Sequence, residues 1–125
     1  MLKAPPKAVL RKIFKKEVDL KRYSFSESDD TYGQATRSLS ETYPIKAEIQ
    51  ELTTEDLSFL PPGVASIGDA YGFFLPTYLV KGREVSVEVE DEIVWDNKIW
   101  RVERIENFYY GSKLWYKRAF LKRVI

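Results

Sequence analysis

Apolar and polar residues alternate with a period of two along much of this 125-residue chain, which is the pattern of β-strands that bury one face. The clearest case lies at residues 85–90, where valines alternate with serine and glutamate. Residues 18–25 and 45–50 repeat the pattern, and their apolar side chains are predicted to face inward. This periodicity restricts the chain to a sheet-based fold.

Further strands are predicted between turn signals. Residues 70–80 are rich in aromatic and β-branched residues, and Pro76 makes them an edge strand or a strand that bends. Residues 93–102 predict a hairpin about Asp96-Asn97, because both residue types tolerate the positive φ of a two-residue turn. The last strand, 114–124, has apolar residues on both faces, so we expect it to be central or wedged between partners. Two more turns are predicted, at Lys81-Gly82 and Gly111-Ser112.

Residues 1–16 predict a basic amphipathic helix that starts at the proline pair Pro5-Pro6. Its charged face is either solvated or placed on a membrane or a nucleic acid. Residues 53–60 predict one or two helical turns, ended by Pro61-Pro62-Gly63. Residues 26–44 are polar and predict a long loop or a loose hairpin.

About six antiparallel strands joined by tight turns predict a mainly β fold, either a small barrel or a sandwich. A length of 125 residues suits one domain. We therefore expect a single domain over 1–125, with a helix at 1–16 and a barrel core over 17–125 that carries the loop 26–44.

The chain contains no cysteine and no histidine. This excludes a disulfide scaffold, a thiol nucleophile, a Cys/His zinc site, a Ser-His-Asp triad and a histidine base. Carboxylates gather at residues 88–92 and at Glu103 and Glu106, so a small hydrolase that uses Glu88 or Glu103 is one hypothesis. The same carboxylates are also explained as solvated charges on the polar face of a strand. We expect that the protein is not an enzyme and binds no cofactor and no metal.

The ends of the chain carry no targeting signal that we recognise. No stretch approaches the ~18–20 consecutive apolar residues of a membrane span. Near the N-terminus, basic residues interrupt the apolar residues, whereas a secretory signal has an uninterrupted apolar segment. We expect synthesis in a cytoplasm and no membrane partner.

Charge is arranged in blocks behind a net value of +1. Residues 1–23 carry eight basic and two acidic side chains, and residues 24–69 carry two basic and nine acidic. Residues 70–106 carry five basic and eight acidic, and residues 107–125 carry five basic and none acidic. The basic ends either pair with the acidic middle inside one fold or form a bipolar surface that docks neighbours or nucleic acid.

Aromatic and basic residues are interleaved in the last strands, which is typical of small barrels that bind single-stranded nucleic acid. A small β core also uses aromatic residues, so both interpretations stay open. The residues concerned are Phe108, Tyr109, Tyr110, Lys113, Trp115, Tyr116, Lys117, Arg118, Lys122 and Arg123.

The order of elements resembles the head-closure, or head–tail joining, proteins of tailed phages and related archaeal viruses. Three stretches carry the likeness: the N-terminal helix leading into 18–23; 45–52 followed by 55–57 and 60–63; and 91–93 with 96–102, closed by 116–124. Asn97 stands where the family usually has glycine in the hairpin turn.

The resemblance implies a small β-barrel that assembles into a 6- or 12-fold ring in the virion neck. A portal or adaptor ring lies above such a ring and tail-tube proteins lie below it, with possible weak contact to packaged DNA. The family has no enzymatic activity, so there are no catalytic residues to carry over. The loop 26–44 is the kind of segment that can line a channel or reach an adjoining ring.

Candidate contact residues for these partners lie in the N-terminal helix, the polar loop, the short helical turn and the last strand. They are Lys7, Arg11, Lys15, Asp30, Tyr32, Leu57, Phe59, Leu60, Pro61, Lys117, Arg118 and Lys122.

Overall fold

A computed structural model describes residues 13–27, 35–54, 58 and 68–124 of the chain. These residues form eight strands, and helical conformation among them is limited to the single residues Ile13, Thr54 and Ser58. The strands are β1 (Lys16–Glu27), β2 (Ala35–Glu51), β3 (Ala70–Phe74), β4 (Tyr78–Val80), β5 (Arg83–Val85), β6 (Glu92–Trp95), β7 (Lys98–Tyr110) and β8 (Lys113–Arg123).

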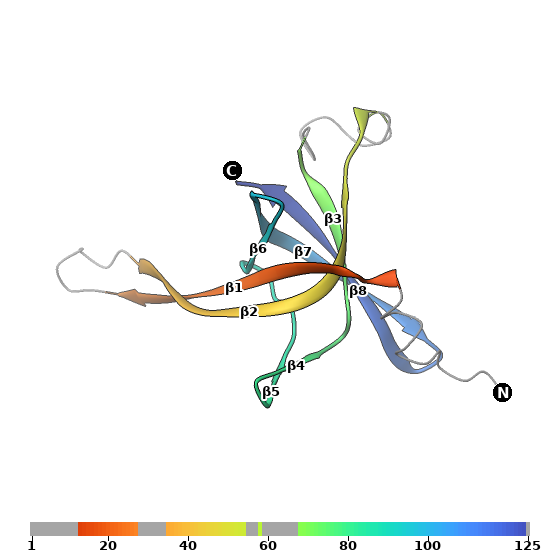
Figure 1. Ribbon diagram of the computed structural model, residues 1–125, viewed down its shortest axis with the longest axis horizontal. Coiled ribbons are helices and arrows are strands. Elements are labelled where there is room, and N and C mark those ends of the chain that lie inside the picture. The colour runs from red at the N-terminus through yellow and green to blue at the C-terminus, as the bar shows by residue number, and fades with distance from the viewer. Residues whose placement is uncertain (1–12, 28–34, 55–57, 59–67, 125) are drawn as a thin grey trace.

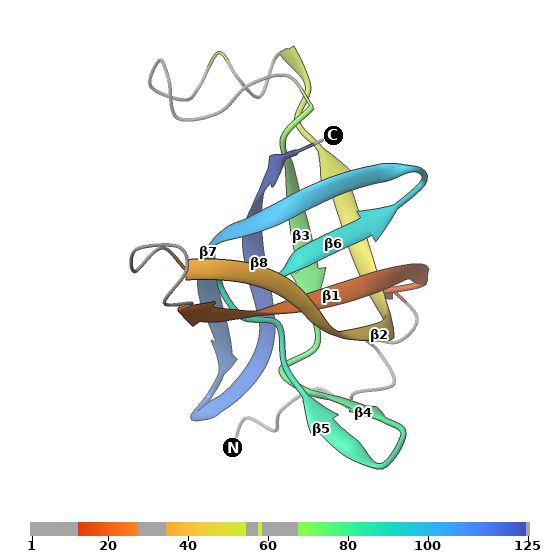
Figure 2. The same ribbon diagram turned by 90° about the vertical axis from the view of Figure 1, so that its left-hand side faces the viewer.

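Six of the strands close into an antiparallel barrel in the order β1-β2-β3-β8-β7-β6 (Figures 1 and 2). Closure occurs where β6 pairs with β7 on one side and with β1 on the other. The structure confirms the predicted mainly β class and selects the barrel over the sandwich. The last strand is central, as predicted, because β8 lies between β3 and β7.

The barrel interior is filled by the inward halves of the alternating strands. Trp100 and Phe74 are the largest fully buried side chains, and the indole Nε1–H of Trp100 donates to the Gly68 carbonyl at 2.8 Å. Other core residues are Val18, Leu20, Ile45, Ala47, Ile49, Ala70, Ile93, Val102, Ala119 and Leu121. Gly72 faces the same interior, where an added Cβ would lie 2.6 Å from the Phe74 ring.

Three hairpins extend beyond the barrel wall (Figures 1 and 2). The outer parts of β1 and β2 form one arm, the two-stranded sheet β4–β5 forms a second, and the far ends of β7 and β8 form a third. The arms leave the barrel in different directions, so each presents its own surface.

The predicted tight turns are confirmed. Lys81 and Gly82 between β4 and β5 have φ of 51° and 78°, and Asp96 and Asn97 between β6 and β7 have φ of 53° and 59°. Successive positive φ values match the right-handed twist of the flanking strands. Gly111, between β7 and β8, also has a positive φ, of 63°.

Of the two alternatives for residues 26–44, the described part shows a hairpin and not a long loop. β1 continues to Glu27 and β2 begins at Ala35, so residues 35–44 are paired strand. Backbone pairing with β1 supplies the hydrogen bonds of this stretch, most of whose described side chains are exposed, and the polar contact Ser24 Oγ to Ser38 Oγ (3.3 Å) joins the arm. Asp30 and Tyr32 lie outside the described residues.

Two other strand predictions need correction. The segment 70–80 is two strands rather than one, because the chain leaves the barrel at Pro76, which cannot donate to a ladder. Residues 86–89 are not strand, although Val85 and Val87 are buried as the alternation predicts. Side-chain bonds to Asp91, described below, hold this stretch in place of a ladder.

The helical predictions fall mainly outside the described residues. Residues 1–12 of the predicted N-terminal helix lie outside the described residues. The last residue predicted for this helix, Lys16, is instead the first residue of β1. Only residues 53, 54 and 58 of the predicted helical turn are described.

Candidate interaction surfaces

Aromatic and arginine side chains share the outer face of β3, β8 and β7. Strand register places Tyr71 beside Phe120 and Phe120 beside Arg104. The next row brings Phe73 beside Arg118 and Arg118 beside Glu106. We call this the aromatic–arginine face; its members are Tyr71, Phe73, Phe108, Tyr116, Phe120, Arg104 and Arg118.

Arg118 is the centre of this face. Its guanidinium lies 5.0 Å from the Tyr71 ring and 5.1 Å from the Phe108 ring, and Nη2 donates to Glu106 Oε2 at 2.8 Å. Arg104 lies 5.3 Å from the Phe120 ring. Cation–π contacts at partly exposed sites contribute about 0.5–1 kcal/mol each. Together these contacts hold the guanidinium groups of Arg104 and Arg118 against the rings in a preorganised layer.

The ring cluster continues to the end of the β7–β8 hairpin. Phe108 and Tyr116 stack with centroids 4.8 Å apart, and Trp115 meets Tyr116 and Tyr110 edge-on at 5.1 Å and 5.8 Å. Tyr109 is 60% exposed although it is a large aromatic residue. The hairpin end is therefore stiffened by ring contacts and still offers an aromatic side chain to solvent.

The predicted basic contact residues of the last strand do not form one patch. Arg118 and Lys122 point outward, and strand register pairs Lys122 with Arg101. Lys117 has the opposite alternation, on the side of Ala119 and Leu121. Lys15 is exposed just before β1. The remaining candidates lie outside the described residues: Lys7, Arg11, Asp30, Tyr32, Leu57, Phe59, Leu60 and Pro61.

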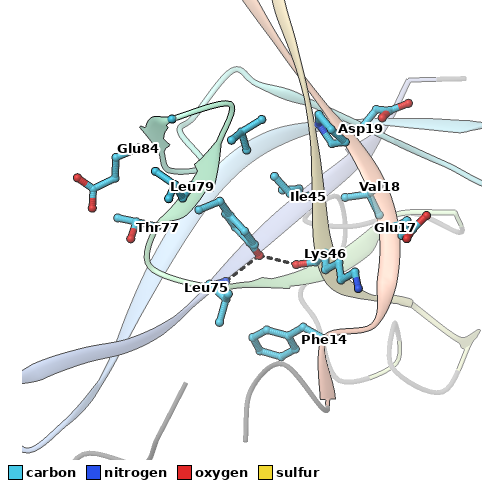
Figure 3. Close-up of a pocket in the computed structure, with 14 residues that line it drawn as sticks. Phe14, Glu17, Val18, Asp19, Ile45, Lys46, Leu75, Thr77, Leu79 and Glu84 are labelled. Atoms are coloured by element: carbon cyan, nitrogen blue, oxygen red, sulfur yellow. Dashed lines mark hydrogen bonds between the residues drawn. The ribbon is translucent and has the colours of Figure 1, made fainter. Parts of the chain in front are cut away.

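A groove of about 1110 Å³ lies between the β4–β5 hairpin and the β1–β2 side of the barrel (Figure 3). Its floor is apolar, formed by Phe14, Val18, Ile45, Leu75 and Val80. The sequence did not predict this groove because no single segment contains it: β1, β2, β4 and β5 each contribute. No sequence signal marks it, because the 79% exposure of the apolar Leu79 beside the groove is visible only in the structure.

Tyr78 fixes the hairpin beside the groove. Its hydroxyl donates to the Lys46 carbonyl at 2.6 Å and accepts from the Leu75 N–H at 2.9 Å. Burial raises the pKa of Tyr78, so the hydroxyl keeps its proton and both bonds. A second tie lies farther along the hairpin, where Arg83 Nη1 donates to Glu41 Oε1 at 2.9 Å.

The rim of the groove is acidic. Glu17 and Asp19 lie on the β1 side and Glu84 lies on the β5 side, and all three are exposed (Figure 3). Lys46 is the basic residue of the lining. The groove thus combines an apolar floor with a rim of net negative charge.

The carboxylate cluster at residues 88–92 is built into the fold. The Asp91 side chain is buried, at 3% exposed. Its carboxylate accepts hydrogen bonds from Arg22 Nε at 3.1 Å, from Arg22 Nη2 at 2.8 Å and from the Glu88 N–H at 2.9 Å. The ion pair with Asp91 raises the pKa of Arg22. Glu92 accepts from the Tyr23 hydroxyl at 2.8 Å. These contacts join the 86–91 segment to β1 and give the two buried carboxylates structural partners.

Other carboxylates of the hydrolase hypothesis stay at the surface. Glu88 and Glu90 are exposed, and Glu103 pairs with Arg101 on the same strand. Within the described part of the chain, no three acidic side chains come together as they would around a metal ion.

Comparisons with protein-family models, with curated proteins and with solved structures find no match to this chain. The described residues also contain no helix that is long and apolar enough to span a membrane.

Proposed function

We propose that this chain is a structural virion protein of the head–tail connector, a head-closure subunit that forms a ring between portal and tail. The observation that carries the proposal is a closed barrel with three hairpins beyond its wall (Figure 1). A closed barrel has no free edge for strand addition, so contacts with neighbours use projecting hairpins and side-chain faces.

The charge distribution on the barrel supports this proposal. Strand β8 carries five basic and no acidic residues, whereas residues 83–92 carry three exposed acidic residues, Glu84, Glu88 and Glu90, and one basic residue. In the closed order β8 lies three strands from β1, on the opposite wall, and Arg22 ties the acidic segment to β1. Opposite charge on opposite sides favours head-to-tail association, and a head-to-tail contact that closes generates a ring.

The resemblance to head-closure proteins supports the same function through the fold that it implies. In this proposal the chain forms a 6- or 12-fold ring in the virion neck, with a portal or adaptor ring above and tail-tube proteins below. It works through its surfaces, with no catalytic step and no cofactor.

Co-purification tests the proposal directly. The chain is expressed with the portal, adaptor and tail-tube proteins encoded in the same viral genome, and each is used as bait. We expect stable capture by at least one neck component. Failure to bind any of them, together with absence from purified particles, would contradict the proposed function.

Single-stranded nucleic acid binding is a second candidate, favoured by the aromatic–arginine face. Rings that are half-buried on a sheet and flanked by arginine can stack bases while the cations contact phosphate. Lys122 extends this face along β8 and forms no ion pair within the described residues, so its charge is available to phosphate.

Titration with single-stranded DNA at several salt concentrations separates the two functions. Nucleic-acid binding predicts micromolar or tighter affinity with a steep loss as salt rises. Replacing Lys117, Arg118 and Lys122 with glutamate then abolishes binding. A control triple of Lys21, Lys46 and Lys81 to glutamate, away from the face, leaves most of it. Weak binding in the unaltered protein would refute this candidate.

A further inference from the structure

The end of the β7–β8 hairpin has the composition of a docking element. Tyr109 and Lys113 are exposed at this end, and Tyr110 is held edge-on against Trp115 at 5.8 Å. Within the described residues, the buried indole Nε1 of Trp115 has no hydrogen-bond partner. A rigid aromatic group with an adjacent cation is the kind of anchor that dominates protein interfaces.

The groove beside β4–β5 has the complementary properties. Its apolar floor includes Phe14 and Leu75, and its rim carries the carboxylates Glu17, Asp19 and Glu84. Aromatic residues bury apolar area against such a floor, and lysine near the rim meets opposite charge. An apolar floor with acidic edges therefore fits a basic aromatic element better than an acidic one.

The two features are separate but neighbouring surfaces of one molecule, since Phe14 of the groove floor meets the Tyr116 ring of β8 edge-on at 6.4 Å. The β4–β5 and β7–β8 hairpins diverge in Figure 1, and the groove lies between β4–β5 and the β1–β2 side of the barrel (Figure 3). The hairpin end and the groove share no residue, so one molecule can offer its hairpin end to a neighbour while its groove receives the hairpin end of another. This is the geometry of a heterologous contact.

We propose that the β7–β8 hairpin end of one copy, residues 109–113, docks in the groove between β1–β2 and β4–β5 of the next copy. The aromatic side chains cover the apolar floor, and Lys113 faces the acidic rim. The occupant is a second copy because the chain itself carries the matching element. This inference rests on the proposed function, since it supplies the subunit contact of the ring.

Disulfide trapping tests the contact, and the absence of native cysteine makes the chain a clean background. Thr77→Cys in the groove and Ser112→Cys in the hairpin turn are made in separate samples, which are mixed at high concentration with a mild oxidant. Bridging requires Cα atoms about 4.4–6.8 Å apart. The control pair is Ser112→Cys with Thr42→Cys, an exposed threonine on the β1–β2 arm.

We expect the 77–112 disulfide to exceed the 42–112 disulfide by about tenfold, the ratio that a docking preference of about 1.4 kcal/mol gives. Lys113→Glu should reduce the 77–112 product, and Glu84→Lys on the partner should restore it. Lys98→Glu, the same charge change at the start of β7, should leave the yield unchanged. Equal yields of the two disulfides, or no effect of Lys113→Glu, would overturn the inference.

Other occupants of the groove give different results. A cysteine at Leu10 that traps Thr77→Cys within one chain, in preference to Ser112→Cys, would assign the groove to the N-terminal segment and overturn the docking. The proposed function fails separately, through absence of the chain from particles. Particles that contain a neck ring whose subunits cannot be linked through residues 77 and 112 would refute the docking alone.

Discussion

The ion pair between Asp91 and Arg22 is the sharpest test of how this barrel is held together. Asp91→Asn keeps the shape of the side chain but removes its charge, and an amide can replace only part of the two bonds from Arg22 and the one from the Glu88 N–H. Breaking one partner of a buried ion pair costs about 3–5 kcal/mol. The Arg22 side chain is 26% exposed and also donates to the Ser86 carbonyl, so we expect a loss of about 2–3 kcal/mol.

Urea unfolding followed by tryptophan fluorescence measures this loss. With a slope of about 1–3 kcal/mol per molar urea, the midpoint should fall by roughly 0.7–3 M. Glu88→Gln is the matched control, because Glu88 lies 3.8 Å from the same guanidinium but its side chain is 64% exposed. Exposed pairs contribute under about 1 kcal/mol. Equal effects of the two substitutions would refute the assignment of Asp91 as the residue that holds the 86–91 segment.

Two further changes probe the core and the groove. Gly72→Ala should destabilise the fold by about 1–3 kcal/mol in urea unfolding, because the added Cβ would lie 2.6 Å from the Phe74 ring; an unchanged midpoint would show that the core has room there. Since burial raises the pKa of Tyr78 above its unfolded value of 10.0, its contribution to stability is complete below pH 10 and is lost as pH rises further. Unfolding midpoints at pH 9 and 11 should therefore differ less in Tyr78→Phe than in the unaltered protein, and an equal difference would contradict this role.

Much of the barrel follows from local patterns. The alternation of apolar and polar residues predicted β1 and the inner half of β2, and the pair Asp96-Asn97 predicted a turn. Both predictions succeeded because a two-residue period and a positive φ are properties of short segments. For the outer half of β2 the sequence left a loop and a loose hairpin open, since its polar side chains show no alternation that would select a strand. Its strand state depends on pairing with β1, which is a long-range interaction.

The candidate surfaces were harder to predict for the same reason. Arg118 was identified from the basic and aromatic composition of the last strand, but its neighbours Tyr71 and Glu106 come from β3 and β7. The groove is formed by segments up to about 70 residues apart in sequence, so only the closed barrel brings Phe14 and Glu84 to one site. Asp91 lies in a predicted acidic cluster, yet its burial depends on Arg22.

Imaging of assembled virus particles by cryo-electron microscopy tests the connector proposal most directly. The proposal predicts a ring at the neck, between portal and tail, into whose density a six-stranded barrel with three projecting hairpins fits in every subunit. Particles with a complete neck in which no layer accommodates this barrel would contradict the proposal.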